Sequence, residues 1–550
     1  MQEPPPLTGN HIRFMPLKET FKMMSATECP RRLSRLAPVM LGILLCAVAA
    51  LWLRTSGEPL IDQFSFRQCQ TAITAQWFDF GHPIHSFLDY ETPVFGTPWQ
   101  VPFEFPLYQA IAAGISQGLG LPLTNCGRLL SAFIFLLTLF PLHSLAKGLG
   151  LGRRFFYLAA FFLICSPFYL YWSRAFLIES TAVFLGFAFV AAVERAAASS
   201  LWKWWGLAGF LAIACALVKS TTYPSFAVAS AAVVLLKSQP GFDRPSLVAL
   251  VKPLSILCGI GIISLFFLTA WTAHADAVKA HGFLTTVLTS QGLHDWNYGT
   301  LRQKLDLGLW REIVWDRTLP GIFGSLWVAG FGLAAALACR GRDAALITGM
   351  VVLFLIPIAL FTNLHKVHIY YQYANAFWLI LAVALAMTVW SRKVPVILSL
   401  AAIFLILITQ LLGFYRGGNY HWMRLRTSPA LAVAKVLKAR IPQSSSILVL
   451  GDDWSPEVAC LSRRRALYLP NWLGADPGTG KQTLEEVINQ PDLLFGSHPL
   501  GAFIINPAWT QAAIQAGAPP ALTNMVADFI RDFPAVSRQN VESYQILWVK

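Results

Sequence analysis

Repeated apolar runs of membrane-spanning length constrain the fold of this 550-residue chain more than any other feature of its sequence. A helix that crosses the bilayer core takes about 20 predominantly apolar residues. The pattern excludes a soluble globular protein and predicts a polytopic α-helical membrane protein. About eleven spans are expected, at 36–53, 129–146, 155–172, 180–194, 204–218, 223–236, 253–273, 319–338, 343–362, 372–390 and 394–414.

The charge distribution favours a membrane topology over a nucleic-acid partner. The formal net charge is +14, but the basic residues fall largely in short loops between the apolar runs. An excess of Lys and Arg is typical of the cytoplasmic loops of membrane proteins. We therefore expect no nucleic-acid partner, and we expect these loops to orient the chain.

The topology depends on the segment 105–121, whose apolarity is ambiguous. If it does not cross the membrane, every second connection lies on the side of the N-terminus, and these connections are the basic ones. If it crosses, they all move outside, which contradicts the positive-inside rule. We therefore predict a juxtamembrane or re-entrant helix at 105–121 and a structured first outer loop at about 54–128. The basic connections contain Lys147, Arg153, Arg154, Arg195, Lys203, Lys237, Arg244, Lys252, Arg340, Arg342, Arg392 and Lys393.

The chain divides into three predicted parts. Residues 1–35 form a polar cytoplasmic tail, and the run that follows is expected to be a retained signal anchor. Residues 36–415 form the transmembrane domain. Residues 416–550 have the pattern of a soluble domain and are expected to form a small α/β domain outside the membrane. Its strands are expected at 446–451, 502–506 and 544–550, and its helices at 429–439 and 484–489.

The cysteines give no metal-ligand pattern. The chain has nine of them and no CxxC, and four lie inside apolar runs, where they act as small hydrophobic residues. Cys69 and Cys126 are both expected outside the membrane. A disulfide between them is left open, because nothing in their spacing demands it.

Unusual polar segments from distant parts of the chain converge on the outer face when the topology is followed through. Such a convergence at one membrane face predicts an active site there. The segments are 62–104, 173–179, 219–223, 274–318, 363–371 and everything after 415.

The stretch LIDQFSFRQCQ places Asp62 and Arg67 just after the first span. Charges beside a membrane are expensive and are therefore usually functional. The functional interpretation of Asp62 is a general base that takes the proton of an acceptor hydroxyl. The structural alternative is a helix N-cap or a solvated loop carboxylate.

Two further carboxylates begin predicted helices. Glu104 precedes a proline at the start of the segment 105–121, and Glu179 begins a span five residues after Arg174. A carboxylate at a helix start interacts favourably with the helix dipole, which is the structural interpretation of both. The functional interpretation is that they belong to the same active site as Asp62.

The stretch LHKVHIYYQYANAF at 364–377 ends a span on the outer side. Tyrosines at such ends are common interfacial anchors. Histidines and a lysine among them form a hydrogen-bonding, cationic cluster of the kind that a lipid-linked phosphate needs. Two histidines without a clear third ligand are only a weak metal signal. The residues concerned are His365, Lys366, His368, Tyr370 and Tyr371.

Five stretches together resemble the bacterial relatives of protein O-mannosyltransferases and aminoarabinose transferases. They are LIDQFSFRQCQTAITAQWF, EFPLYQ, SRAFLIESTAVF, ALVKST near Lys219, and HKVHIYYQYA. The resemblance covers about residues 36–415 and rests on the set, since no single stretch is diagnostic. It implies a GT-C fold and a glycosyltransferase that uses a polyprenyl-phosphate sugar. The tail around 449–470 also resembles the outer domain of some such proteins.

The resemblance also implies roles for individual residues. The family's catalytic first-loop aspartate falls on Asp62, and its acidic residue after the third span falls on Glu179. Many members have an acidic pair in the first loop, whereas here the neighbour of Asp62 is Gln63, so a role that needs two adjacent carboxylates is not supported. Lys219 and the 365–371 cluster would face the donor phosphate. No metal site is assigned, and participation of a divalent ion stays open.

The implied reaction turns a phosphodiester into a phosphate monoester, so negative charge grows on the leaving group. Fixed cations stabilise that charge more in the transition state than in the substrate. Asp62 would accept the acceptor proton, with inversion at the anomeric carbon, and Glu179 would orient the acceptor or the sugar. The candidate cations are Arg67, Arg174, Lys219, His365 and Lys366.

We expect a multi-pass protein of the bacterial inner membrane, with its active site and its C-terminal domain outside the cytoplasm. Its partners would be a polyprenyl-phosphate-linked sugar, membrane lipid and an acceptor that the sequence does not name. The main alternative is a transporter or flippase for a lipid-linked sugar, which should carry ionisable residues at mid-membrane. In the tail, Asp452, Asp453 and Glu457 are interpreted either as solvated loop charges or as an acceptor-recognition surface.

Overall fold

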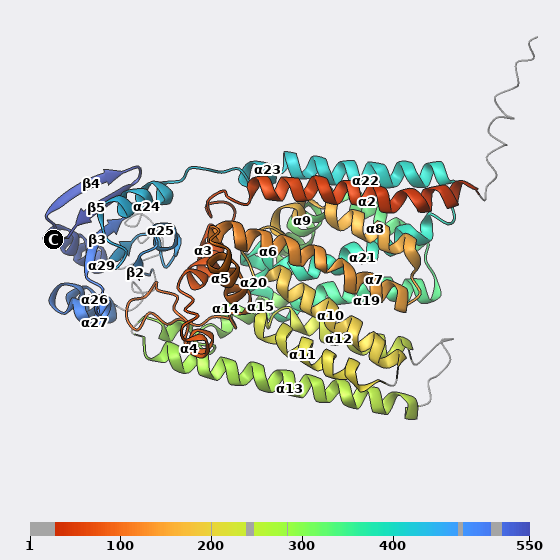
Figure 1. Cartoon of the computed structure of the whole chain (residues 1–550), viewed down its shortest axis with the longest axis horizontal. Coiled ribbons are helices and arrows are strands. Elements are labelled where there is room, and N and C mark those ends of the chain that lie inside the picture. The colour runs from red at the N-terminus through yellow and green to blue at the C-terminus, as the bar shows by residue number, and fades with distance from the viewer. Residues whose placement is uncertain are drawn as a thin grey trace, which may run out of the picture.

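A long bundle of helices and a smaller five-stranded sheet at one of its ends make up the molecule (Figure 1). The computed structural model describes residues 28–199, 201–237, 247–282, 284–470, 477–507 and 520–549. Most of the predicted cytoplasmic tail, residues 1–27, lies outside the described residues. The predicted combination of a helical membrane domain with a C-terminal α/β domain is therefore present in the fold.

Seven of the described helices are long and apolar enough to cross a membrane. An eighth candidate is a pair of helices, Leu307–Phe323 and Leu326–Leu337, which meet at 95°. All eleven predicted segments are helical over most of their length, but the number of crossings stays a prediction, since several of these helices are short. The seven helices are Leu36–Thr55, Leu123–Gly148, Glu179–Ala198, Leu250–Ala280, Gly341–Leu360, Ile369–Trp390 and Val396–Arg416.

The bundle contains the helices of the predicted spans and a set of connecting elements. The main helices of the predicted spans are α2 (Glu28–Thr55), α6 (Leu123–Leu137), α7 (Leu139–Gly148), α8 (Gly152–Cys165), α10 (Glu179–Ala198), α11 (Trp202–Val218), α12 (Tyr223–Lys237), α13 (Leu247–Ala280), α18 (Leu326–Leu337), α19 (Gly341–Leu360), α21 (Gln372–Trp390) and α22 (Val396–Arg416). The other elements are α3 (Ser65–Gln76), α4 (Pro83–Leu88), α5 (Leu107–Leu119), α9 (Pro167–Trp172), η1 (Thr286–Leu288), α14 (His294–Tyr298), α15 (Leu301–Leu305), α16 (Leu307–Trp310), η2 (Arg311–Thr318), α17 (Leu319–Phe323), α20 (Thr362–Val367), η3 (Ile369–Tyr371) and α23 (Asn419–Trp422).

The ambiguous segment 105–121 contains α5, a helix of 13 residues. At 1.5 Å per residue such a helix is about 20 Å long, shorter than the hydrocarbon core of about 30 Å. It ends at Gly120, whose φ of 64° is a left-handed conformation that favours glycine. In Figure 1, α3 and α5 lie between the long helices and the sheet, which supports a juxtamembrane position.

The sheet has the strand order β2-β1-β3-β5-β4. β1 (Ser446–Leu450) pairs in parallel with β2 (Arg465–Leu469) and β3 (Leu500–Ile505), while β5 (Tyr544–Trp548) is antiparallel to β3 and to β4 (Ser537–Val541). The predicted strands at 446–451, 502–506 and 544–550 correspond to β1, β3 and β5. The helices of this domain are α24 (Pro429–Arg440), α25 (Glu457–Ser462), α26 (Pro477–Asn489), α27 (Pro491–Phe495) and α29 (Pro520–Asp532).

The first outer loop covers the edge of the sheet at β2. The amides of Ala466 and Tyr468 donate to the carbonyls of Pro93 and Val94 at 3.0 Å, and the amide of Gly96 donates back to Ala466 at 3.3 Å. At Gly96, with φ 76°, a Cβ would lie 2.8 Å from the carbonyl oxygen of Leu494. The loop thus satisfies an edge that would otherwise be open to pairing with other chains.

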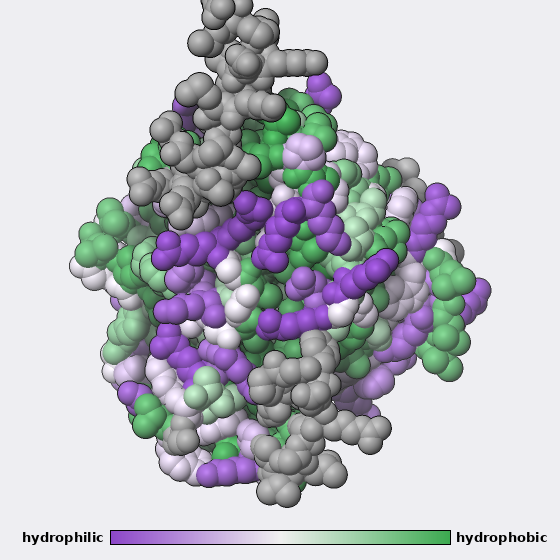
Figure 2. Space-filling view, turned by 90° about the vertical axis from the view of Figure 1, so that its right-hand side faces the viewer, coloured by the Kyte–Doolittle hydropathy of each residue, from purple (hydrophilic) through white to green (hydrophobic). Residues whose placement is uncertain are grey.

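The opposite end of the bundle carries the basic connections. Figure 2 views this end and shows hydrophilic side chains spread across it. The exposed basic residues of the predicted cytoplasmic connections include Lys147, Arg153, Arg154, Arg195, Lys203, Arg340, Arg342, Arg392 and Lys393. The parity argument therefore agrees with the fold, since it assigns these connections and the C-terminal domain to opposite ends.

Candidate active site

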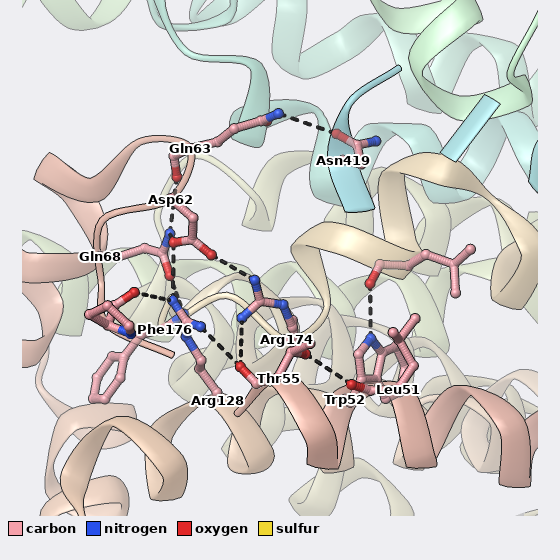
Figure 3. Close-up of polar contacts among 12 residues, drawn as sticks. Leu51, Trp52, Thr55, Asp62, Gln63, Gln68, Arg128, Arg174, Phe176 and Asn419 are labelled. Atoms are coloured by element: carbon pink, nitrogen blue, oxygen red, sulfur yellow. Dashed lines mark hydrogen bonds and ion pairs between the residues drawn. The ribbon is translucent and has the colours of Figure 1, made fainter. Parts of the chain in front are cut away.

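Asp62 lies between two buried arginines, Arg128 and Arg174, at the end of the bundle that faces the sheet (Figure 3). Its Oδ2 accepts from Arg174 at 2.7 Å, and its Oδ1 accepts from Arg128 at 3.1 Å. Gln68 of α3 also donates to Oδ1, at 2.6 Å. All three ionic side chains are at least 97% buried. Both carboxylate oxygens are thus already engaged by protein donors.

The end of the first span anchors the same arginines. The carbonyl of Thr55, in the last turn of α2, accepts from Arg128 at 3.2 Å and from Arg174 at 3.4 Å (Figure 3). Cations are stabilised near a helix C-terminus, where carbonyl groups lack intrahelical partners. The cluster therefore fixes α2, α6 and the segment after α9 against one another.

The Asp62 loop continues into a strained residue, Phe64, with φ 51° and ψ 43°. A bulky residue in this left-handed conformation needs surrounding structure to hold it. The ring of Phe64 packs at 5.2 Å from that of Tyr370 and at 5.8 Å from that of His368. This contact joins the first loop to the 365–371 segment.

A second carboxylate, Glu179, forms a buried ion pair with Lys219. Glu179 begins α10 and Lys219 follows the end of α11, so two apolar helices bring the pair to the same end of the bundle. Lys219 binds Oε1 of Glu179, while Oε2 is buried and has no hydrogen-bond partner among the described residues. Burial lowers the pKa of Lys219, and the charge of Glu179 opposes this effect.

Arg67 and Glu104 form a third ion pair, at 2.8 Å, between α3 and the start of α5. The second oxygen of Glu104 accepts from Gln109 at 2.9 Å. Burial disfavours the charge of Arg67, but Glu104, Tyr370, Tyr371 and Glu179 outweigh it, so the pKa of Arg67 is raised. Arg67 thus interacts electrostatically with Glu179 and stays positively charged.

The 365–371 segment completes this group. The ammonium of Lys219 lies 4.2 Å from the ring centre of Tyr371 and 5.5 Å from that of Tyr370, which is cation–π geometry. Burial, together with Lys219, lowers the pKa of His365 to about 3, and burial together with Arg67 lowers that of His368 to about 4. Both rings are therefore neutral at pH 7, so His365 differs from the fixed cation that the sequence suggested.

The structure thus sorts the predicted site residues into two neighbouring clusters. The Asp62 cluster consists of Asp62, Arg128, Arg174 and Gln68. The Glu179 cluster consists of Glu179, Lys219, Arg67, Glu104, His365, His368, Tyr370 and Tyr371. Lys366 is the exposed member of the predicted set, and its carbonyl accepts from Arg317. Arg317 also donates to the carbonyl of His365 at 2.9 Å.

Sequence reasoning missed Arg128, Gln68 and Arg317. Arg128 comes directly before the apolar run 129–146, and Arg174 comes two residues after the run 155–172. Both arginines thus lie beside a predicted span, and this shared position was the available signal. Gln68 lies six residues after Asp62, in the stretch that drew attention to Asp62. Nothing in the sequence distinguishes Arg317 from the other charges of the 274–318 segment.

The charges in the C-terminal tail are engaged with neighbouring side chains. Asp452 accepts from Asn506 and from Tyr544, each at 2.8 Å, and Glu457 accepts from Ser65 of α3 at 2.5 Å. Burial raises the pKa of both carboxyls. These two residues therefore differ from the solvated loop charges that were one interpretation of the sequence. Within the described residues, no group of three or more His, Cys, Asp or Glu side chains is arranged to hold a metal ion.

Comparison with known proteins identifies the fold. The sequence matches no family model and no curated protein. Its structure is similar to that of ArnT from Cupriavidus metallidurans bound to undecaprenyl phosphate, with a TM-score of 0.58 and 12% identity over 92% of this chain and 97% of that one. Apo ArnT from the same organism matches with a TM-score of 0.50 and 12% identity, over 93% and 98% of the two chains. The predicted GT-C-like fold, with its small C-terminal domain, is confirmed.

Proposed function

We propose that this chain is a glycosyltransferase that moves a sugar from a polyprenyl-phosphate donor to an acceptor at the outer face of the bacterial inner membrane. The observation that carries the proposal is the Glu179 cluster, where Arg67 and Lys219 lie beside a carboxylate oxygen with no partner among the described side chains. A buried site with both fixed cations and an available acceptor suits transfer from a phosphate leaving group. The fold, shared with a protein bound to undecaprenyl phosphate, supports the donor class.

In this mechanism, the bond between the anomeric carbon and the phosphate oxygen breaks while a bond to the acceptor oxygen forms. The phosphate gains negative charge, which Arg67 would stabilise in the transition state, while Lys219 stays paired with Glu179 on the side of the base. Removing one such donor raises the barrier by about 2.7–4 kcal/mol. His365 and His368, as neutral rings, would donate hydrogen bonds to the phosphate, and its charge would raise their pKa values. The acceptor proton passes to a carboxylate on the opposite face of the sugar, with inversion.

Two carboxylates are candidates for the base. The general-base role of Asp62 stays a prediction, because both of its oxygens accept from arginines and one guanidinium must leave before it takes a proton. Glu179 has one oxygen bound by Lys219 and one without a described partner. The geometry therefore favours Glu179 as the proton acceptor, and it favours Asp62 as the residue that positions Arg174 and Arg128.

The decisive experiment is sugar transfer by the purified chain in nanodiscs, with a panel of polyprenyl-phosphate sugars and with candidate lipid, glycan and protein acceptors. Release of free polyprenyl phosphate, with product of inverted anomeric configuration by NMR, is the expected result. If no donor in the panel is cleaved and the lipid instead moves between leaflets, the protein is a transporter and the transferase proposal fails.

A further inference from the structure

We propose that Tyr90 is a positioning residue for sugar transfer: its hydroxyl fixes the backbone of Glu104, and Glu104 holds Arg67 toward the donor phosphate. Tyr90 lies in the loop between α4 and α5, and only 3% of it is exposed. The inference rests on the proposed function, in which Arg67 stabilises the leaving group. It adds a residue that acts through another side chain, 14 positions further along the sequence.

The hydroxyl of Tyr90 makes three hydrogen bonds with the backbone just before α5. It accepts from the amide of Phe103 at 2.6 Å and from that of Glu104 at 3.2 Å, and it donates to the carbonyl of Glu104 at 2.8 Å. One donor and two acceptor sites are all that a hydroxyl offers. Burial, together with the charge of Glu104, raises the pKa of Tyr90 well above its usual value. The hydroxyl therefore keeps the proton that its third bond requires.

The side chain of Glu104 carries this position to Arg67. Its Oε2 accepts from Arg67 at 2.8 Å, and its Oε1 accepts from Gln109 of α5 at 2.9 Å. Arg67 also donates to Gln70 on its own helix, α3. Both carboxylate oxygens are thus engaged, so a displaced Glu104 backbone would displace the guanidinium with it.

A helix of the bundle holds Tyr90 in turn. Trp271 of α13 stacks on Tyr90, with ring centres 6.5 Å apart, and meets the ring of Phe105 at 5.4 Å. These three rings belong to a small apolar cluster that is separate from the main core. His274 lies one turn later on the same face of α13 and binds Asp89 at 3.0 Å. The backbone on either side of the Tyr90 ring is therefore anchored to α13.

The same segment also reaches the other ion pair of the site. The amide of Phe105 donates to the carbonyl of Leu217 at 3.4 Å, and Leu217 lies two residues before Lys219. Fixing the backbone of Glu104 therefore also fixes the Arg67–Glu104 pair relative to the end of α11. The hydroxyl of Tyr90 thus acts where the first loop meets the Glu179 cluster.

Tyr90→Phe removes the hydroxyl and keeps the ring that packs on Trp271. We expect kcat for the release of polyprenyl phosphate to fall about 10- to 100-fold, because a small misplacement of a catalytic group is costly, while KM changes less. The matched control is Tyr108→Phe, because Tyr108 is buried on α5 and its hydroxyl donates to the carbonyl of Gly127 at 2.7 Å. Its melting temperature should fall to a similar extent while its activity is kept. Equal losses of activity in the two variants would overturn the inference.

A double-mutant cycle decides whether Tyr90 acts through Arg67. Tyr90→Phe combined with Arg67→Gln should have nearly the kcat of Arg67→Gln alone, because a guanidinium that has been removed cannot be misplaced. If the two reductions in kcat multiply instead, Tyr90 does not act through Arg67 and the inference is wrong.

Amide hydrogen exchange separates this inference from the proposed function. The amides of Phe103 and Glu104 should exchange at least about 10-fold faster in Tyr90→Phe than in the wild type, and at the wild-type rate in Tyr108→Phe. A wild type that shows this difference and cleaves no polyprenyl-phosphate sugar would refute the proposed function, while the contact between Tyr90 and Glu104 would stand. Unchanged exchange in Tyr90→Phe, with an active wild type, would overturn the inference alone.

Discussion

Asp62 and Glu179 are both buried carboxylates at the same end of the helical bundle, but they are held in opposite ways. Asp62 faces two guanidiniums and an amide, and both of its oxygens are engaged. Glu179 faces one ammonium and keeps one oxygen without a partner in the part of the chain that the structure describes. A buried carboxylate whose two oxygens are both engaged is suited to stabilising the fold, whereas a carboxylate with one unpaired oxygen can act on a substrate.

The largest expected effect is on the stability of Asp62→Asn. The substitution leaves Arg128 and Arg174 buried without their anion, which should cost about 3–5 kcal/mol of unfolding free energy. Chemical unfolding in detergent measures it. Replacing all three ionic residues with apolar ones of similar volume should recover most of the loss but no activity. If Asp62→Asn has the unfolding free energy of the wild type and loses only activity, the proposed difference between Asp62 and Glu179 is wrong and Asp62 is the base.

Glu179→Gln should lose activity with its fold kept. We expect a fall in kcat of at least about 100-fold, on the order of the loss of a general base, with a smaller change in unfolding free energy than Asp62→Asn shows. The matched control is Glu194→Gln, because Glu194 lies on the same helix, α10, and is paired with Lys237 at 2.6 Å at its other end. Equal losses of activity in the two variants would mean that activity depends on the ion pairs at both ends of α10, and that Glu179 does not act as a base.

Arg67→Gln tests the cation that is proposed to face the leaving group. Loss of a donor that acts in the transition state should lower kcat by about 100-fold and change KM less, and Arg67→Lys should restore part of the activity. The control is Arg426→Gln, because Arg426 forms an exposed ion pair with Glu58 at 2.7 Å and should leave activity unchanged. A rise in KM alone would assign Arg67 to ground-state binding.

The smallest expected effect is the pH dependence that the two histidines give to stability. Their pKa values fall from about 6.5 in the unfolded chain to about 3 for His365 and about 4 for His368. The unfolded state therefore binds more protons between these values, so the stability that the neutral rings contribute is present above about pH 6.5 and is lost on acidification. The raised pKa values of Asp452 and Glu457 act in the opposite direction.

Melting temperatures from pH 7.5 to 5 test this sign. His365→Gln and His368→Gln should each flatten the loss on acidification relative to His82→Gln, which alters an exposed histidine of the first loop. If the melting temperatures of both variants fall on acidification as steeply as that of the wild type, the buried histidine rings do not cause the pH dependence of stability.

The fold was predictable where the pattern has one physical cause. Apolar runs located the long helices, and the buried strands β1 and β3 appear as the apolar stretches SILVL and AFII. Strands β2 and β4 were missed because three arginines lead into the first and because the second, SRQNV, is polar and partly exposed. Pairing across the sheet, and not their composition, makes them strands.

The candidate site was predictable in its members more than in its pairings. Topology alone brought Asp62, Glu179 and Lys219 to one face. It could not show that Arg128 and Arg174 share Asp62, because the angle between helices decides which side chains meet. His365 is neutral because it is buried, and the sequence pattern around it does not predict this burial.

The pairing between the first outer loop and the C-terminal sheet also has a consequence for biosynthesis. Glu91 and Arg465 meet at 2.6 Å although 374 residues separate them in the chain. At about 5–20 residues per second, a ribosome needs roughly 20–75 s to make that interval. Throughout that time the loop stands outside the membrane without the partner that covers it. The contact between the first loop and the sheet is therefore among the last parts of the protein to be assembled, and a chain interrupted before its final strands would leave this contact unformed.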